Sequence, residues 1–203
     1  MAFNDYKNIG QVQKEFNIQY QEETFVRSQP VPPTPTFVTE FEFNQRNIDV
    51  YASEAARTEM IIAPVLREVY KDYYEQLAFW IQKPITYTAI LSGTPDYIIS
   101  MKSALGKTVL ETPLLLVVEA KRNDFEQGWG QCLAELVAAQ KLNETPELAL
   151  YGIVTDGKLW EMGKLINSVF TKNVESFTVD HLAHLFGALH FVFAASATNL
   201  VTP

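Results

Sequence analysis

Two carboxylates and a lysine in this sequence have the types and spacing that metal-assisted cleavage of a phosphodiester requires. Asp96 stands at the start of one apolar run, and Glu119 and Lys121 stand two residues apart at the end of another. Carboxylate oxygens suit Mg²⁺, with Mn²⁺ as its substitute, and the Ala120 carbonyl is a further candidate ligand. Such a cation polarises a phosphate and lowers the pKa of a bound water. Lys121 can orient that water or neutralise the charge that builds up on the phosphate.

The elements around these residues are expected to bring them together. Residues two apart on a strand point to the same face, so Glu119 and Lys121 should project together while Ala120 turns into the packing. Five apolar residues precede Glu119, which is typical of a central strand buried on both faces. If the strand that begins at Asp96 pairs beside it, both carboxylates and the ammonium share a small volume. The alternatives are a turn role for Asp96 and a weak, solvated ion pair at the strand end.

The remaining pattern predicts an α/β fold, with a central mixed β-sheet flanked by α-helices. Ser53 is the expected N-cap of the first long helix, and Pro64 should either kink that helix or start a second one. The expected elements are a helix over 53–80, strand-like runs at 85–93, 95–103 and 114–121, a helix over 124–143, a hairpin over 148–165 and a helix over 177–197.

The chain is expected to divide into an arm and one domain. Residues 1–35 end in a proline-dense run, which favours an extended linker or strap on the surface. Residues 36–203 are long enough for a single domain with a sizeable core.

Composition limits the classes of function. The formal net charge is −8 among 203 residues, which counts against a simple basic nucleic-acid binder. The single cysteine, Cys132, excludes an internal disulfide. The N-terminal residues do not resemble a secretory signal, and no run approaches the roughly 18 apolar residues of a membrane span. We therefore expect a cytoplasmic protein without a membrane partner.

The order of these motifs resembles the PD-(D/E)XK nuclease superfamily, which has the restriction-endonuclease-like fold. The matching residues are Pro95-Asp96 and Glu119-Ala120-Lys121, and the hairpin with Thr155-Asp156-Gly157 is similar to a Thr-(Asn/Asp)-Gly hairpin of the family. The segment SEAARTEMIIAPVL resembles the helix that opens the nuclease domains of type I restriction enzyme subunits. The resemblance covers about residues 50–165.

The resemblance implies further site residues. It places an acid of the preceding helix at the metal, which is Glu54 here, with Glu59 as the alternative. It also implies a supporting glutamine on the following helix, which is Gln131, with Gln127 as the alternative. Where the family often has a tyrosine four residues later, this chain has Glu135.

The expected function is therefore Mg²⁺-dependent hydrolysis of DNA, in which Asp96, Glu119 and Glu54 bind the metal, Lys121 assists the attacking water and Gln131 supports it. A partner protein could supply target recognition. The alternative is a non-catalytic nucleic-acid-binding or regulatory module on the same fold. The tail helix is more apolar than one packed face requires, so it should either pack on the sheet or also form a homodimer interface. Its large apolar residues are Leu182, Leu185, Phe186, Leu189, Phe191 and Phe193.

Overall fold

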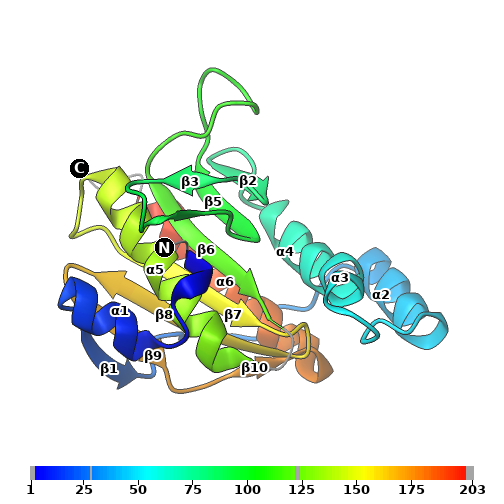
Figure 1. The fold of residues 1–203 in the computed structure, drawn as a ribbon. Helices are drawn as coiled ribbons and strands as arrows, with labels where there is room; N and C mark the ends of the chain where they lie inside the picture. Colours follow the sequence, from blue (N-terminus) through cyan, green and yellow to red (C-terminus); the bar gives the residue numbers. More distant parts are fainter. Residues whose placement is uncertain (1–2, 28, 122–123, 200–203) are drawn as a thin grey trace.

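The computed structural model describes residues 3–27, 29–121 and 124–199, and it confirms the α/β class. A central mixed sheet has the strand order β1-β9-β8-β7-β6-β5-β2, with β10 paired to β8, and helices cover both of its faces (Figure 1). The sheet strands are β1 (Gln19–Glu23), β2 (Leu77–Ile81), β5 (Tyr97–Met101), β6 (Leu114–Ala120), β7 (Leu150–Thr155), β8 (Leu159–Ile166), β9 (Val169–Asn173) and β10 (Phe177–Thr178). The α-helices are α1 (Ile9–Phe16), α2 (Pro35–Asn47), α3 (Glu54–Arg57), α4 (Ala63–Tyr70), α5 (Phe125–Asn143) and α6 (Leu182–Thr198), and 3₁₀ turns lie at Phe3–Asp5 and Val179–His181.

Strand β6 is the central strand that its apolar run predicts, because every one of its residues is buried. It pairs antiparallel with β5 and parallel with β7. Parallel neighbours need a crossover connection, and α5 provides it by returning the chain across one face of the sheet. The two central strands therefore place their ends beside the start of a helix.

The two faces of β6 enter different cores. Val118 and Ala120 belong to the core that contains α4 and α6, whereas Val117 belongs to the core beneath α1 and α5. Since side chains alternate along a strand, Glu119 lies on the α5 side with Val117. This confirms that Ala120 turns into the packing while Glu119 faces the other way.

The helix expected over 53–80 is shorter and is interrupted. Ser53 is its N-cap, and its Oγ accepts a hydrogen bond from the Ala56 amide at 3.0 Å. A π-helical turn spans Thr58–Ile62, and α4 follows it. Pro64 lies in the first turn of α4, a position that tolerates a residue without a backbone N–H. The prediction was wrong beyond α4, because β2 forms an edge strand against β5. Helix-compatible spacing there is overridden by strand pairing.

The strand expected at 85–93 does not join the central sheet. Its ends form β3 (Ile85–Thr86) and β4 (Ser92–Gly93), which pair with each other as a separate two-stranded unit. Ile85 and Leu91 are buried, so this unit covers part of the α5-side core.

The N-terminal arm differs from the separate segment that its sequence predicts. Phe3, Tyr6 and Val12 are buried in the α5-side core, and β1 extends the sheet by pairing parallel with β9. All five residues of β1 are exposed, so its place depends on backbone pairing rather than on an apolar pattern. In the proline-dense part, the Val31 amide donates to the Ala183 carbonyl of α6 at 2.8 Å, and Pro35 already begins α2.

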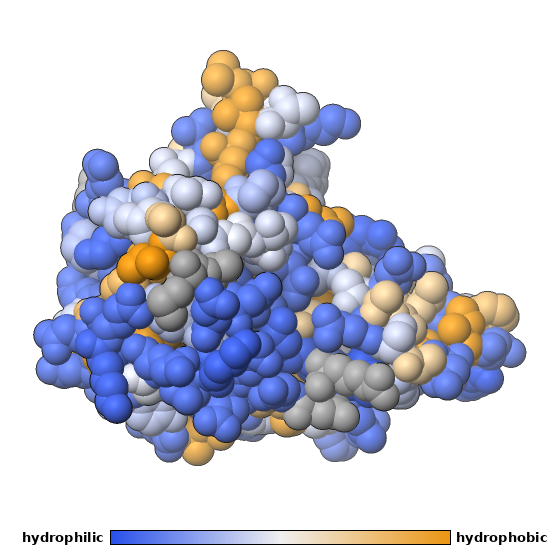
Figure 2. Space-filling view, viewed as in Figure 1, coloured by the Kyte–Doolittle hydropathy of each residue, from blue (hydrophilic) through white to orange (hydrophobic). Residues whose placement is uncertain are grey.

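Helix α6 packs on the sheet, which accounts for its apolar character. Leu185, Phe186, Leu189 and Phe193 are buried within this chain. Figure 2 shows hydrophobic side chains gathered instead on the projecting loop between β5 and β6, where Leu105 is 80% exposed. Among the described residues, no helix is both long and apolar enough to cross a membrane.

Candidate active site

Asp96, Glu119 and Lys121 meet where β5 begins and β6 ends. The antiparallel register pairs Tyr97 with Val118, so Asp96 lies beside the end of β6. Its Oδ2 accepts a hydrogen bond from the Ala120 amide at 2.8 Å. The Lys121 Nζ lies 2.8 Å from Glu119 Oε1. The structure therefore brings the three side chains into one polar cluster, as their spacing predicts.

Burial dominates the electrostatics of the two acids. The Glu119 side chain is only 2% exposed, and burial together with the nearby Asp96 carboxylate raises its pKa to about 8, although Lys121 opposes the shift. Burial also raises the pKa of Asp96, against the Ala120 amide and Lys121, which lower it. Both shifts mean that the protein leaves these carboxylates short of positive charge.

Lys121 responds in the opposite way. Burial lowers its pKa, but the Glu119 and Asp96 carboxylates outweigh this effect and leave the pKa raised. Lys121 therefore stays protonated as an ammonium, and 21% of its side chain is exposed. Such a group can donate hydrogen bonds to an incoming anion but is poorly suited to act as a base.

A glycine on α5 permits the close approach of helix and lysine. A Cβ at Gly128 would lie 2.7 Å from Val154 Cγ1 and 3.1 Å from Lys121 Cγ. Any larger residue would push the first turn of α5 away from the strand end. Trp129, next in sequence, is packed as expected: it is 2% exposed and its Nε1 donates to Glu161 Oε2 at 2.6 Å.

The donor set suits a hard divalent cation. Glu119 Oε2 is buried and accepts no hydrogen bond from a donor of the described residues, and the carboxyl groups of Asp96 and Glu135 are close neighbours of this side chain. A buried carboxylate oxygen is costly unless a proton or cation satisfies it. Within residues 3–27, 29–121 and 124–199, no group of three or more His, Cys, Asp or Glu side chains is arranged to hold a metal ion. The fit therefore rests on the pair Asp96 and Glu119.

The two acids proposed for the third position behave differently. The charge of Glu54, at the start of α3, raises the pKa of both Asp96 and Lys121. The charge of Glu59 instead raises the pKa of Tyr97. Glu54 thus lies within electrostatic range of the cluster, and its role as a ligand stays a prediction.

Gln131 lies in the depth of the cluster rather than on its surface. It is 3% exposed, and its Nε2 donates to Glu135 Oε1 at 3.0 Å. No hydrogen bond in the described part of the chain joins it to Lys121. Gln127, its alternative, donates its backbone amide to Asp124 at the helix N-cap.

The sequence did not predict a role for Glu135 or Arg57 near the cluster. Glu135 is completely buried, and burial followed by the charge of Glu119 raises its pKa well above the usual range. A charged residue four positions after Gln131 on an otherwise apolar helix was the signal for it. Arg57 had no such signal, because its partner, Asp156, is distant in sequence.

A comparison with solved structures finds a structural likeness. No protein-family model and no curated protein matches the chain. A chain in the cryo-electron microscopy structure of the DrdV–DNA complex is similar over 79% of this chain, with a TM-score of 0.45 and 15% identity. The match covers 14% of that chain, so this chain corresponds to about one seventh of its length.

Proposed function

We propose that the chain is a Mg²⁺-dependent nuclease of the PD-(D/E)XK type, hydrolysing phosphodiester bonds of DNA. The observation that carries the proposal is the meeting of Asp96, Glu119 and Lys121 at the ends of two neighbouring strands, where one Glu119 oxygen is buried without a hydrogen-bond donor among the described residues. When bound, the divalent cation would polarise the phosphate and lower the pKa of the attacking water.

Oxygen atoms of four residues would bind the cation. Asp96 and Glu119 would hold the cation, with the Ala120 carbonyl as a further oxygen ligand. Asp96 is held in place by the Ala120 amide, so the two strand ends form a rigid support. Glu54 would complete the set of acids from the solvent side of the cluster, since its side chain is exposed.

Lys121 would face the reacting phosphate. Its ammonium is held by Glu119 through one contact, which leaves further N–H groups for an anion or a water. As charge builds up on the phosphate oxygens, this positive charge stabilises it. Gln131 would support the cluster from beneath by fixing Glu135 beside Glu119.

Metal binding tests the proposal directly. Wild-type protein should bind Mn²⁺ in a calorimetric titration, and Asp96→Asn should lose this binding while its circular dichroism spectrum is unchanged. The matched control is Glu161→Gln, since Glu161 also forms a lysine pair on the α5 side of the sheet. Equal Mn²⁺ affinity in wild type and Asp96→Asn would remove the metal site from the proposal.

The second candidate is a non-catalytic nucleic-acid-binding or regulatory module, which the net charge of −8 favours. A nuclease core of this charge would need a partner protein to bring DNA to it. A protein that binds Mn²⁺ yet leaves every DNA substrate intact would support this candidate.

A homodimer through α6 remains a further proposal. The side chains left for it are Leu182 and Phe191, which are only partly buried. Light scattering at high protein concentration would decide the point, and a monomer would exclude the dimer.

A further inference from the structure

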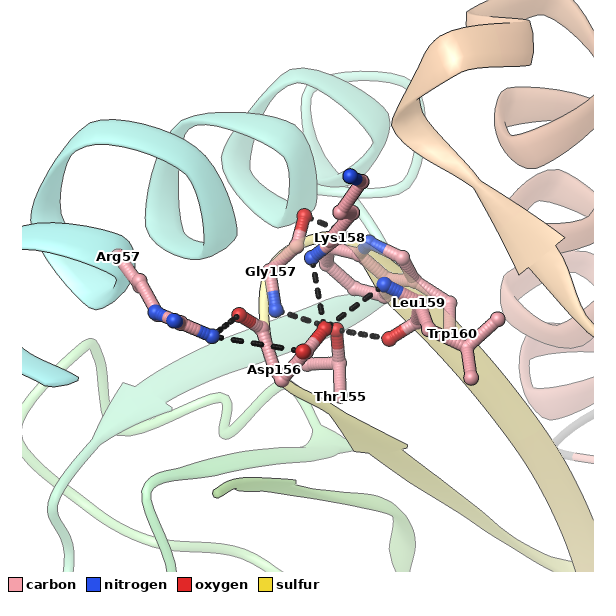
Figure 3. A network of polar contacts seen from close by, with 7 residues as sticks. All are labelled: Arg57, Thr155, Asp156, Gly157, Lys158, Leu159 and Trp160. Atoms are coloured by element: carbon pink, nitrogen blue, oxygen red, sulfur yellow. Dashed lines mark hydrogen bonds and ion pairs between the residues drawn. The ribbon is translucent and has the colours of Figure 1, made fainter. Parts of the chain in front are cut away.

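The turn between β7 and β8 is held rigid by its own side chains (Figure 3). Asp156 Oδ1 accepts hydrogen bonds from the Lys158 and Leu159 amides at 2.9 and 2.8 Å. Thr155 Oγ1 donates to the Leu159 carbonyl at 2.8 Å and accepts from the Gly157 amide at 3.0 Å. Side-chain bonds of this kind fix a turn in one conformation.

Arg57 joins this turn to α3. Its Nη1 donates to the Asp156 carbonyl at 3.1 Å and lies 3.4 Å from Asp156 Oδ2 (Figure 3). The two side chains are only 10% and 13% exposed. The Tyr51 ring covers the guanidinium, with Cζ 5.4 Å from the ring centroid. The pair is therefore sheltered from water, where such contacts are stronger than on the surface.

Arg57 ties the first turn of a longer helical segment to the hairpin. Helix α3 is four residues long and continues directly into the π-helical turn at Thr58–Ile62 and then into α4, and Arg57 is the buried residue among its own four. Helix ends fray, so a contact at this end stabilises the first turn of the segment. Gly157 lies in the turn with a φ of +85°, which L side chains rarely adopt, and a Cβ there would be in ordinary contact with Arg57 Cβ at 3.4 Å. Arg57 thus fixes the turn of helix that carries Glu54.

The same hairpin also holds Lys121. Ala120 pairs with Thr155 in the parallel register of β6 and β7, and the Lys121 amide donates to the Thr155 carbonyl at 2.9 Å. Two consecutive residues of the hairpin, Thr155 and Asp156, therefore contact the backbone of the lysine and the helix of Glu54. The hairpin sets the separation between these two charged side chains.

We propose that the Arg57–Asp156 pair is a positioning device, which fixes Glu54 relative to Lys121 through the β7–β8 turn. The inference rests on the proposed metal site for its consequence, because Glu54 is the group that it positions. Partners that orient metal ligands typically change metal affinity by about 10- to 100-fold when removed.

The test compares Arg57→Met with a matched control, Arg46→Met. Arg46 also forms an arginine–carboxylate pair, with Glu42 at 2.6 Å, but on the exposed surface of α2. Arg57→Met should weaken Mn²⁺ binding about 10- to 100-fold and speed hydrogen exchange of the amides of residues 54–57. Arg57→Lys, which keeps the charge, should recover part of both effects, and Arg46→Met should show neither.

A double variant separates positioning from general damage. In a Glu54→Gln background, Arg57→Met should cause no further loss of Mn²⁺ affinity, because the pair acts through Glu54. An equal further loss there, or unchanged exchange and affinity in Arg57→Met, would overturn the proposal. If Arg57→Met does not fold, Arg57→Lys in the same two backgrounds decides the question.

Failure of the proposed function gives a different result. If wild-type protein does not bind Mn²⁺, the metal site is wrong, and hydrogen exchange still measures whether Arg57 holds α3. Unchanged exchange would then overturn the positioning role by itself.

Discussion

Two lysine–glutamate pairs on the α5 side of the sheet have the same geometry and different surroundings. Lys121–Glu119 and Lys172–Glu161 both have an N–O distance of 2.8 Å, and the lysine side chains are 21% and 25% exposed. Glu161 receives a second hydrogen bond, from Trp129, on the same oxygen as Lys172. Glu119 instead has a second oxygen with no partner among the described residues.

The difference between the two pairs lies in how fully the carboxylate oxygens are satisfied. In the Lys172–Glu161 pair, one carboxylate oxygen accepts from both Lys172 and Trp129. The Glu161 side chain is 15% exposed, so water can reach the other oxygen. The Lys121–Glu119 pair is incomplete in a place from which water is largely excluded. Buried polar groups are costly unless satisfied, so an incomplete pair needs a functional reason. Three predictions test this difference between the two pairs.

The largest expected effect is on cleavage by Lys121→Ala. Removing a group that stabilises charge in the transition state costs about 10²–10³-fold in rate, so cleavage of plasmid DNA should become undetectable. The fold should survive, because Glu119 can take up a proton when its partner is lost. Lys172→Ala removes the matching pair and should cleave at the wild-type rate. Wild-type cleavage by Lys121→Ala would refute the role of the lysine.

The next effect is on stabilisation by Mg²⁺. A ligand at 100 times its Kd stabilises the folded state by about 2.7 kcal/mol, and urea unfolding with Mg²⁺ or with a chelator measures the difference. Glu119→Gln should lose this stabilisation because it removes a charged ligand, whereas Glu161→Gln should retain it. The comparison fails if both variants respond to Mg²⁺ alike.

The elements that the sequence predicts correctly are those that depend on local patterns. The sequence alone identified β5, β6, α5 and the β7–β8 hairpin, because buried runs, helical spacing and an Asp-Gly turn are local signals. The sequence also predicted that Asp96 lies close to Glu119 and Lys121, since alternation along a strand determines which side chains share a face.

What the sequence could not reveal depends on contacts between distant segments. The run at Leu77 has helix-compatible spacing, and only pairing with β5 makes it a strand. Strand β1 has no apolar pattern, since its five residues are exposed and only β9 places it. Arg57 and Asp156 are 99 residues apart in the chain, so no local sequence pattern predicts their contact.

The third effect is a difference in the pH dependence of stability in the presence of a chelator. Folding raises the pKa of Glu119 to about 8, mainly through burial, whereas an unfolded glutamate has a pKa of about 4.3. Between these values the folded state holds more protons than the unfolded state, so stability falls as pH rises. One such group contributes at most about 1.4 kcal/mol per pH unit.

Urea unfolding of the metal-free protein from pH 5 to 8 measures this slope. Glu119→Gln should make it shallower, because a glutamine does not titrate, while Asp96 and Glu135, whose pKa values burial also raises, keep part of the slope. Identical slopes in wild type and Glu119→Gln would mean that burial does not raise the pKa of Glu119. A shallower slope in Glu119→Gln would show that the folded state disfavours the charge of Glu119, and burial together with the neighbouring Asp96 carboxylate is the cause we infer.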